Sequence, residues 1–565
     1  ASTLTMDTAV FPTLAEGGAL TVMGEPIVFT TAGETLAVNG SVALQGEASF
    51  TCPLGGTGSL SATGARLTLA GDTSGYSGTV SLSTATTLIA ATSGALAFAQ
   101  SEGVLNLSQA DFPLSGAGTL ELSLEEGGSV KMAGYGAERF SGNLLVSSGT
   151  LIFPQATSGY GPLYGRTLTV RGNHSVLATG SNRDATGWNC TDGQKLILEA
   201  GGVFELNLRD TFGSPLEMTA GIVRLMPNTP NGACSIQLYN GQTTTVKAQA
   251  EASASEPTVS YLTVDAAAEG DARKAKITHA DWNAVVEENA CFQVDAVLSS
   301  VGAYGVNKTG PGELVLTAEN LYTGATTVAA GTLTVSGTTG TGTTTVAAGA
   351  VLRGTGTVKG DLVFAADGTS ILDVSASASA PLKVAGTLTN APTLRLAETP
   401  ERPIQVLAVT GENATLSAAN VRLPGTLSAT TAILLSADRK TLYVGPRGTA
   451  LAAYATESKP WSEQPWVDMA LGLLVSDVDW TAVESVWLTP MAEVSVALDV
   501  ETFPALTAFS VGQHEGYTLA LTGKPFSAPN LTSFAVEGNL TVEGSVLSAV
   551  PAMLFGSGVL TFRNS

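Results

Sequence analysis

The stretch Val328-Ala329-Ala330-Gly331-Thr332-Leu333 decides the fold, because it returns along the chain at a fixed interval. It reappears 18 residues later as Val346-Ala347-Ala348-Gly349-Ala350-Val351 and, after the same interval, more loosely as Phe364-Ala365-Ala366-Asp367-Gly368. Between the copies lie alternating segments bounded by glycines, such as Thr332-Leu333-Thr334-Val335. This pattern is typical of short strands separated by turns.

A fixed period of this length predicts a repeat fold. One unit of strand, turn and strand cannot bury its apolar face alone, so neighbouring units must stack. Eighteen residues is about one coil of a β-solenoid, and each coil advances by about 4.8 Å, the spacing of hydrogen-bonded strands. We therefore expect Val328, Val346 and Phe364 to stack above one another in a dry interior.

The same stretch resembles a known family. The resemblance rests on Lys308-Thr309-Gly310-Pro311-Gly312-Glu313-Leu314-Val315-Leu316-Thr317, on Asn320-Leu321-Tyr322-Thr323-Gly324-Ala325-Thr326-Thr327-Val328 and on Gly331-Thr332-Leu333. These residues are similar to the autotransporter-associated β-strand repeat, which occurs in passenger regions of bacterial autotransporters and in large exported bacterial surface proteins. The resemblance implies an all-β, right-handed parallel β-helix at or beyond the cell surface, and it implies no chemistry.

An aromatic residue, a small polar residue and a glycine recur before a strand at three places. They are Tyr76 with Gly78, Phe140 with Gly142, and Tyr322 with Gly324. We expect a turn in which the glycine takes a positive φ while the ring covers the edge of the coil. A carbohydrate-stacking role for the three rings is the alternative.

Composition and charge limit the possible partners. The chain has 565 residues with 64 glycines, 13% charged residues and 44% hydrophobic residues, which suits many short strands around a buried core rather than disorder. The net charge of −22 disfavours nucleic acid and anionic membranes, because both would repel it. Acidic stripes that bind Ca²⁺ are an alternative, but the Asp-containing nonapeptides that would support them are missing.

Neither a targeting segment nor the cysteine content fixes the compartment or the redox state. No apolar run approaches the length of a membrane helix, and the chain opens at Ala1 without a signal sequence. The resemblance implies an extracellular or cell-surface location, with an export signal removed before Ala1. The four cysteines fit no zinc motif. Cys190 and Cys234, the nearest pair, could form a disulfide, and buried thiols are the alternative.

The chain divides by pattern into five segments. We predict solenoid coils at 1–155, coils with irregular loop insertions at 156–302, regular coils at 303–449, a Trp-rich joint or cap at 450–490, and a C-terminal β unit or resumed solenoid at 491–565. Within them we predict a short helix at 279–289 after a capping box, and a hairpin at 437–444 that turns at its charged residues. Two short helices are predicted from Trp466, Met469 and Leu473 and from Trp480, Val483 and Trp487.

The sequence contains no catalytic, cofactor-binding or metal-binding pattern. The histidines His174, His279 and His514 share no metal-ligand spacing, and no phosphate loop, zincin helix or nucleophile elbow is present. Parallel β-helices can carry polysaccharide lyases and glycosidases that use acid pairs. The candidates for such chemistry would be Arg183, Asp184, Arg209 and Asp210, which are more naturally loop ion pairs.

These observations favour a secreted or cell-surface structural or adhesive β-solenoid that is not an enzyme. Its expected partners are further copies of itself, in fibres, or an extracellular glycan or host surface, since unpaired edge strands favour self-association. The alternative is an extracellular polysaccharide-degrading enzyme on a β-helix scaffold. A third possibility, a detached passenger of a barrel-anchored autotransporter, follows from the resemblance.

Overall fold

A computed structural model describes residues 2–563 except for a set of gaps. The gaps are 6–12, 15, 24–26, 32, 64–65, 84–86, 92–103, 107–113, 125–126, 134–139, 154–166, 180–194, 208–210, 213–214, 227–236, 239–243, 253, 265–273, 278–280, 301, 375–379, 397, 428–429 and 544–553. The chain divides into unit 1, Ala1–Ala350, and unit 2, Val351–Ser565. The five segments predicted from the sequence are not tested by this division and stay a prediction.

In the first part of unit 1, each coil adds one strand to each of three parallel ladders. The first ladder contains β1 (Ser2–Thr5), β4 (Ile27–Thr30), β7 (Ala48–Phe50), β10 (Arg66–Leu69) and β13 (Thr87–Ala91). The second contains β2 (Thr13–Leu14), β5 (Leu36–Val38), β8 (Leu54–Gly56) and β11 (Gly75–Tyr76). The third contains β3 (Ala19–Met23), β6 (Ser41–Gln45), β9 (Ser59–Thr63), β12 (Thr79–Leu82) and β15 (Leu114–Gly116).

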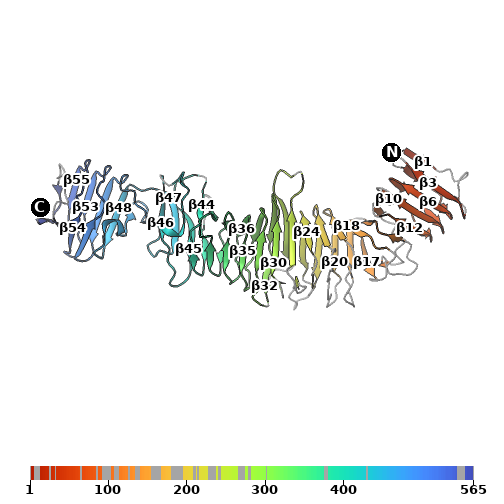
Figure 1. The fold of residues 1–565 in the computed structure, drawn as a ribbon, viewed down its shortest axis with the longest axis horizontal. Coiled ribbons are helices and arrows are strands. Elements are labelled where there is room, and N and C mark those ends of the chain that lie inside the picture. Colours follow the sequence, from red (N-terminus) through yellow and green to blue (C-terminus); the bar gives the residue numbers. More distant parts are fainter. Residues whose placement is uncertain are drawn as a thin grey trace. The chain divides into compact units, whose positions relative to one another are not determined.

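The rest of unit 1 continues the first ladder and builds others beside it (Figure 1). The first ladder proceeds through β16 (Thr119–Ser123), β18 (Asn143–Phe153), β19 (Thr167–Arg171), β21 (Lys195–Glu199), β24 (Leu216–Thr219), β27 (Thr244–Gln249), β30 (Trp282–Val286), β33 (Val306–Thr309), β35 (Thr326–Val328) and β37 (Thr344–Val346). The second side contains β14 (Val104–Asn106), β17 (Ser129–Ala133), β18, β20 (Ser175–Thr179), β22 (Val203–Asn207), β25 (Ile222–Met226), β28 (Thr258–Val264), β31 (Ala290–Val294), β34 (Glu313–Leu316) and β36 (Thr332–Val335). A third contains β23 (Thr211–Phe212), β26 (Gln237–Leu238), β29 (Lys274–Ile277) and β32 (Val297–Ser300).

The register confirms the stacking predicted from the repeat within unit 1. Val328 of β35 lies directly opposite Val346 of β37, 18 residues on, and both are fully buried. Phe364 is also buried and lies in unit 2. Coil length is not constant, because Thr244 pairs with Trp282, 38 residues on. The described pairs of unit 1 are thus those of a parallel β-solenoid whose coils lengthen where the sequence loses its period.

Alternation explains why these segments are strands around one core. In β30 the buried residues Trp282, Ala284 and Val286 alternate with partly exposed Asn283 and Val285. Like residues stack between coils, as where the rings of Phe29 and Phe50 lie parallel with their centroids 4.4 Å apart. Burying one such side chain contributes about 1.5–3 kcal/mol. The predicted helix at 279–289 is therefore wrong for the residues described there, since Trp282–Val286 is a strand with period two.

The glycines after the recurring aromatic residues serve a different purpose from the one predicted. Gly78, Gly142 and Gly324 do not have a positive φ. A Cβ at Gly78 would overlap the carbonyl oxygen of Gly58 in the previous coil and also the ring of Tyr76. A Cβ at Gly142 would likewise overlap the carbonyl oxygen of Gly118 and the ring of Phe140. The predicted reason was wrong, because close approach of neighbouring coils, not backbone handedness, requires glycine at these corners.

Unit 2 begins with parallel pairs and then changes direction. Its first strands are β38 (Val351–Arg353), β39 (Thr357–Val358), β40 (Leu362–Phe364), β41 (Ile371–Asp373), β42 (Leu382–Val384), β43 (Leu388–Thr389), β44 (Thr393–Arg395) and β45 (Ile404–Val409). β45 pairs in antiparallel fashion with β47 (Thr441–Pro446), which also pairs with β46 (Thr431–Leu435). The hairpin between β46 and β47 turns at Asp438 and at Arg439, which has a φ of 56°. The charged-turn hairpin predicted there is confirmed.

The C-terminal part of unit 2 returns to parallel coils. β48 (Ala450–Ala455), β51 (Ser485–Pro490), β53 (Ala508–Val511), β55 (Ser533–Val536) and β57 (Leu554–Phe555) form one ladder. β52 (Val494–Leu498), β54 (Thr518–Gly523), β56 (Asn539–Glu543) and β58 (Val559–Arg563) form the other. The described residues of 491–563 thus contribute parallel strands to both ladders, and the choice between a C-terminal β unit and a resumed solenoid stays a prediction.

Two further predicted helices are wrong. The residues around Trp466 and Trp480 form β49 (Val467–Asp468), β50 (Leu474–Val475) and β51 instead, next to the 3₁₀ helix η4 (Trp461–Glu463). The only other helix among the described residues is the 3₁₀ helix η3 (Ala418–Asn420). None of the described helices is long and apolar enough to cross a bilayer. The architecture is all-β as predicted, while its handedness stays a prediction.

The close approach at Gly78 predicts a position-specific loss of stability. Gly78→Ala should destabilise its coil by roughly 1–3 kcal/mol, because the added carbon overlaps Gly58 and Tyr76. Gly75→Ala is the matched control, since its added carbon would lie 3.6 Å from the nearest atom, the carbonyl oxygen of Leu54, in ordinary contact. Amide hydrogen exchange of Leu60 and Val80, which pair in β9 and β12, measures both variants. Equal protection in the two variants would show that the corner can relax.

Candidate functional site

The repeat segment places a lysine in the interior of unit 1. Lys308 alternates inward with Val306 along β33, and its side chain is fully buried. Its Nζ donates to three backbone carbonyl oxygens, those of Thr309 at 3.0 Å, Gly310 at 2.7 Å and Ala330 at 3.0 Å. The ammonium therefore joins the turn after β33 to the turn after β35 in the next coil. Burial lowers the pKa of Lys308 to about 8, against a smaller opposing effect of the Glu313 carboxylate.

Asn320 and Tyr322 extend this network across the coils. The Oδ1 of Asn320 accepts from the backbone N–H of Leu298 at 2.8 Å, and its Nδ2 donates to the carbonyl oxygen of Thr338 at 2.6 Å. The hydroxyl of Tyr322 lies 2.6 Å from that of Thr326, and burial raises the pKa of the phenol. These polar groups face other protein groups, so the segment acts as an internal brace rather than a ligand site.

The carbohydrate-stacking alternative for the three recurring aromatic residues is wrong. Tyr322 and Phe140 are fully buried, and Tyr76 is 6% exposed. The Tyr76 hydroxyl donates inward, to the carbonyl oxygens of Gly58 at 2.9 Å and Thr79 at 3.1 Å. The rings of Tyr76 and Phe140 fill the space beside Gly78 and Gly142, and the ring of Tyr322 fills the space beside Gly340, so a sugar cannot reach them.

Several predicted candidates lie outside the described residues. These are the possible disulfide partners Cys190 and Cys234, the candidate acid–base residues Arg183, Asp184, Arg209 and Asp210, and His279. Cys52 and Cys291 are buried thiols. His174 is exposed, and His514 stacks on Tyr517 with ring centroids 6.1 Å apart. No cluster of three or more possible metal ligands occurs among the residues the structure describes.

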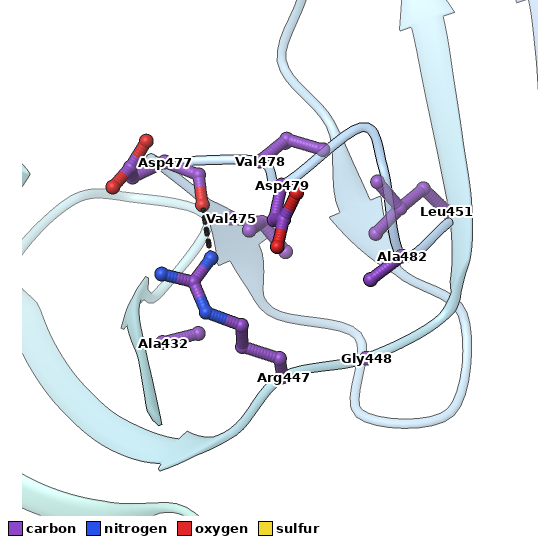
Figure 2. A pocket seen from close by; sticks show the side chains of 9 residues that line it. All are labelled: Ala432, Arg447, Gly448, Leu451, Val475, Asp477, Val478, Asp479 and Ala482. Atoms are coloured by element: carbon purple, nitrogen blue, oxygen red, sulfur yellow. Dashed lines mark hydrogen bonds between the residues drawn. The ribbon is translucent and has the colours of Figure 1, made fainter. Parts of the chain in front are cut away.

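A small cavity lies where the antiparallel part of unit 2 meets its C-terminal coils (Figure 2). The guanidinium of Arg447 donates to the carbonyl oxygen of Asp477 at 3.1 Å, and Asp479 lies beside it. The Thr481 hydroxyl donates to the Asp479 carboxylate at 2.6 Å and lowers its pKa. The cavity volume of about 10 Å³ accommodates about one water molecule. This site fastens the loop after β50 and is too small for an organic ligand.

Aromatic residues form the core of the C-terminal coils. Trp461 is fully buried, and its ring lies 4.7 Å from that of Trp466, 5.5 Å from that of Trp480 and 5.7 Å from that of Phe503. The indole N–H of Trp466 donates to the carbonyl oxygen of Trp461 at 2.8 Å. Trp461, Trp466 and Trp480 thus pack into the apolar core of the C-terminal coils and do not lie on the two predicted helices.

Trp487, in contrast, points out of the sheet. It is 37% exposed on β51, and Tyr454 on the neighbouring strand β48 is 57% exposed. From the sequence, Trp487 was predicted to lie on a helix, and no predicted feature included Tyr454. The signal was present in Ser485-Val486-Trp487-Leu488-Thr489, where inward Val486 and Leu488 leave Trp487 on the outer face.

Comparison with known proteins supports the family resemblance for the segment that contains Lys308, Asn320 and Tyr322. The passenger-associated-transport-repeat family matches residues 306–335, which run from β33 to β36 and include Lys308, Asn320 and Tyr322. No curated protein and no solved structure matches the chain. The family match therefore covers the brace and its neighbouring strands, and it does not reach the outward face of β48 and β51.

The buried lysine predicts a pH dependence of stability. Its folded pKa of about 8 lies below the ordinary 10.5, so between these values the unfolded chain holds more protons, and the free energy of unfolding rises with pH. Below pH 8 both states are protonated and this contribution is constant. The difference in urea stability between the natural chain and Lys308→Met should rise by up to about 3 kcal/mol from pH 8 to 10.5.

The control for this experiment is Lys524→Met, which removes an exposed ion pair with Glu501. That variant keeps Lys308, so the difference in stability between it and Lys308→Met should rise with pH as it does for the natural chain. A difference between the natural chain and Lys308→Met that stays flat across this pH range would show that the Lys308 amine keeps its ordinary protonation in the coil.

Replacing a buried tryptophan and replacing an exposed one should lower the stability of unit 2 by different amounts. Trp461→Ala should lower the stability of unit 2 by about 3–5 kcal/mol, because it opens a cavity among four rings. Trp487→Ala should cost much less, since part of its ring already faces water. Thermal unfolding followed by near-ultraviolet circular dichroism compares them, and similar losses would contradict the assignment of Trp487 to the outer face.

Proposed function

We propose that this chain is a secreted or surface-displayed bacterial β-solenoid with a structural and adhesive role, as in autotransporter passengers. The observation that carries the proposal is the passenger-associated-transport-repeat match at residues 306–335, within coils that stack in parallel register. The role proposed is not enzymatic, and it includes self-association into fibres.

The physical properties of the chain support this role. A solenoid lengthens by adding coils without enlarging its cross-section, so it suits display away from a surface. The net charge of −22 keeps the exterior soluble and discourages contact with anionic membranes. In the interior, buried groups such as Lys308 and Asn320 tie one coil to the next, which favours a rigid spacer.

Protease treatment of intact bacteria that produce the chain tests its location. A surface-displayed chain should be cut at exposed loops while a cytoplasmic marker stays whole, and a secreted chain should be present in the medium. Mass spectrometry of the released peptides and immunoblots of both fractions are the measurements. A chain that becomes accessible only after lysis, together with the marker, would refute the surface role.

A further inference from the structure

The outward face of the ladder β48–β51–β53–β55 carries two exposed aromatic side chains, Tyr454 and Trp487. Its core-facing residues, such as Leu451, Val486 and Phe509, are buried, so the residues between them face outward. The partly or fully exposed outward residues are Ala450, Ala452, Tyr454, Ser485, Trp487, Ala508, Ser510, Ser533 and Ala535, while Thr489 is outward by alternation but only 7% exposed. None of them is charged, although the chain carries 74 charged residues, 26 basic and 48 acidic. The next outward position after Ala535 is Glu537, which is exposed and acidic.

Two aromatic side chains rise from this surface of small residues. Trp487 lies opposite Ala452 on one side and Ser510 on the other, and Tyr454 lies opposite Thr489. Trp487 and Tyr454 are therefore diagonal neighbours on adjacent strands, a separation of about 7–8 Å between backbones. The residues opposite them, Ala452, Thr489 and Ser510, are small, and Trp487 and Tyr454 are 37% and 57% exposed.

Trp487 is held in place before any ligand arrives. Its indole N–H donates to the hydroxyl of Thr489 at 3.0 Å. A Cβ at Gly512 would lie 2.6 Å from that nitrogen, so the absence of a side chain at Gly512 provides the space in which the edge of the indole rests. Fixing the ring in advance reduces the entropy lost on binding.

We propose that this face binds an uncharged glycan through stacking on Trp487 and Tyr454. A neutral sugar ring has an apolar C–H face that covers an aromatic ring, and a rim of hydroxyls that can bond to the partly exposed Ser485 and Ser510. An acidic polysaccharide would find no cation on this face and would be repelled by the net charge of −22. The inference rests on the proposed adhesive role and names its ligand class.

The test is binding of the purified full chain to an array of immobilised neutral and acidic oligosaccharides. At least one neutral glycan should bind, and Trp487→Ala and Tyr454→Ala should each weaken it about tenfold, which corresponds to about 1.4 kcal/mol. Trp487→Phe should retain part of the affinity. Met23→Ala, which removes a 66%-exposed apolar side chain from unit 1, is the control and should bind as the natural chain does.

Three results would overturn the proposal. The first is no binding to any neutral glycan by a folded chain, and the second is binding that neither Trp487→Ala nor Tyr454→Ala weakens. The third is a concentration-dependent dimer in sedimentation that Trp487→Ala abolishes, which would assign the face to a second copy. Tyr454→Ala keeps the test valid if Trp487→Ala unfolds, and protease accessibility on intact cells is measured independently of all three.

Discussion

Neighbouring coils of this chain come so close at their corners that only particular groups fit between them. At Gly78 and Gly142 any side chain would overlap the previous coil. At other corners an Asp or Asn side chain accepts a hydrogen bond from a backbone N–H of the next coil. Asp281 accepts from Gly305 at 2.9 Å, and Asn143 accepts from Thr167 at 2.9 Å. Stacking of the core depends on these corners, because the ladder register is lost if one coil lifts away from the next.

This constraint explains which elements could be predicted from the sequence. Where coils are short and equal, the corner residues recur at a fixed interval, and the pairing of Val328 with Val346 follows from spacing alone. Where a coil runs to 38 residues, as from Thr244 to Trp282, no interval repeats and the strands lose their signature. The helix expected at 279–289 arose there, because Trp282, Val285 and Val286 fit a helical stripe as well as they fit part of an alternating strand.

The candidate site was predictable only in part, for a related reason. Alternation shows that Lys308 shares one face of β33 with Val306, and that Trp487 lies on the face of β51 opposite to Val486 and Leu488. Whether a residue on a given face is buried depends also on strands that are distant in sequence. Ala330, just after β35, accepts a hydrogen bond from Lys308, and Ser510 of β53 lies opposite Trp487. Lysine is ordinarily exposed and tryptophan ordinarily buried, so residue type alone would reverse both assignments.

The outward residues of the coils can change without altering the buried contacts that hold the coils together. The brace of Lys308, Asn320 and Tyr322 uses its polar groups to hold coils together, and it exposes little that a partner could recognise. On the β48–β51 face, an outward substitution leaves the buried alternation of Leu451, Val486 and Leu488 intact. A solenoid can therefore acquire a recognition surface without altering its stack, and an uncharged aromatic face on an acidic chain is a feature that stacking itself does not require.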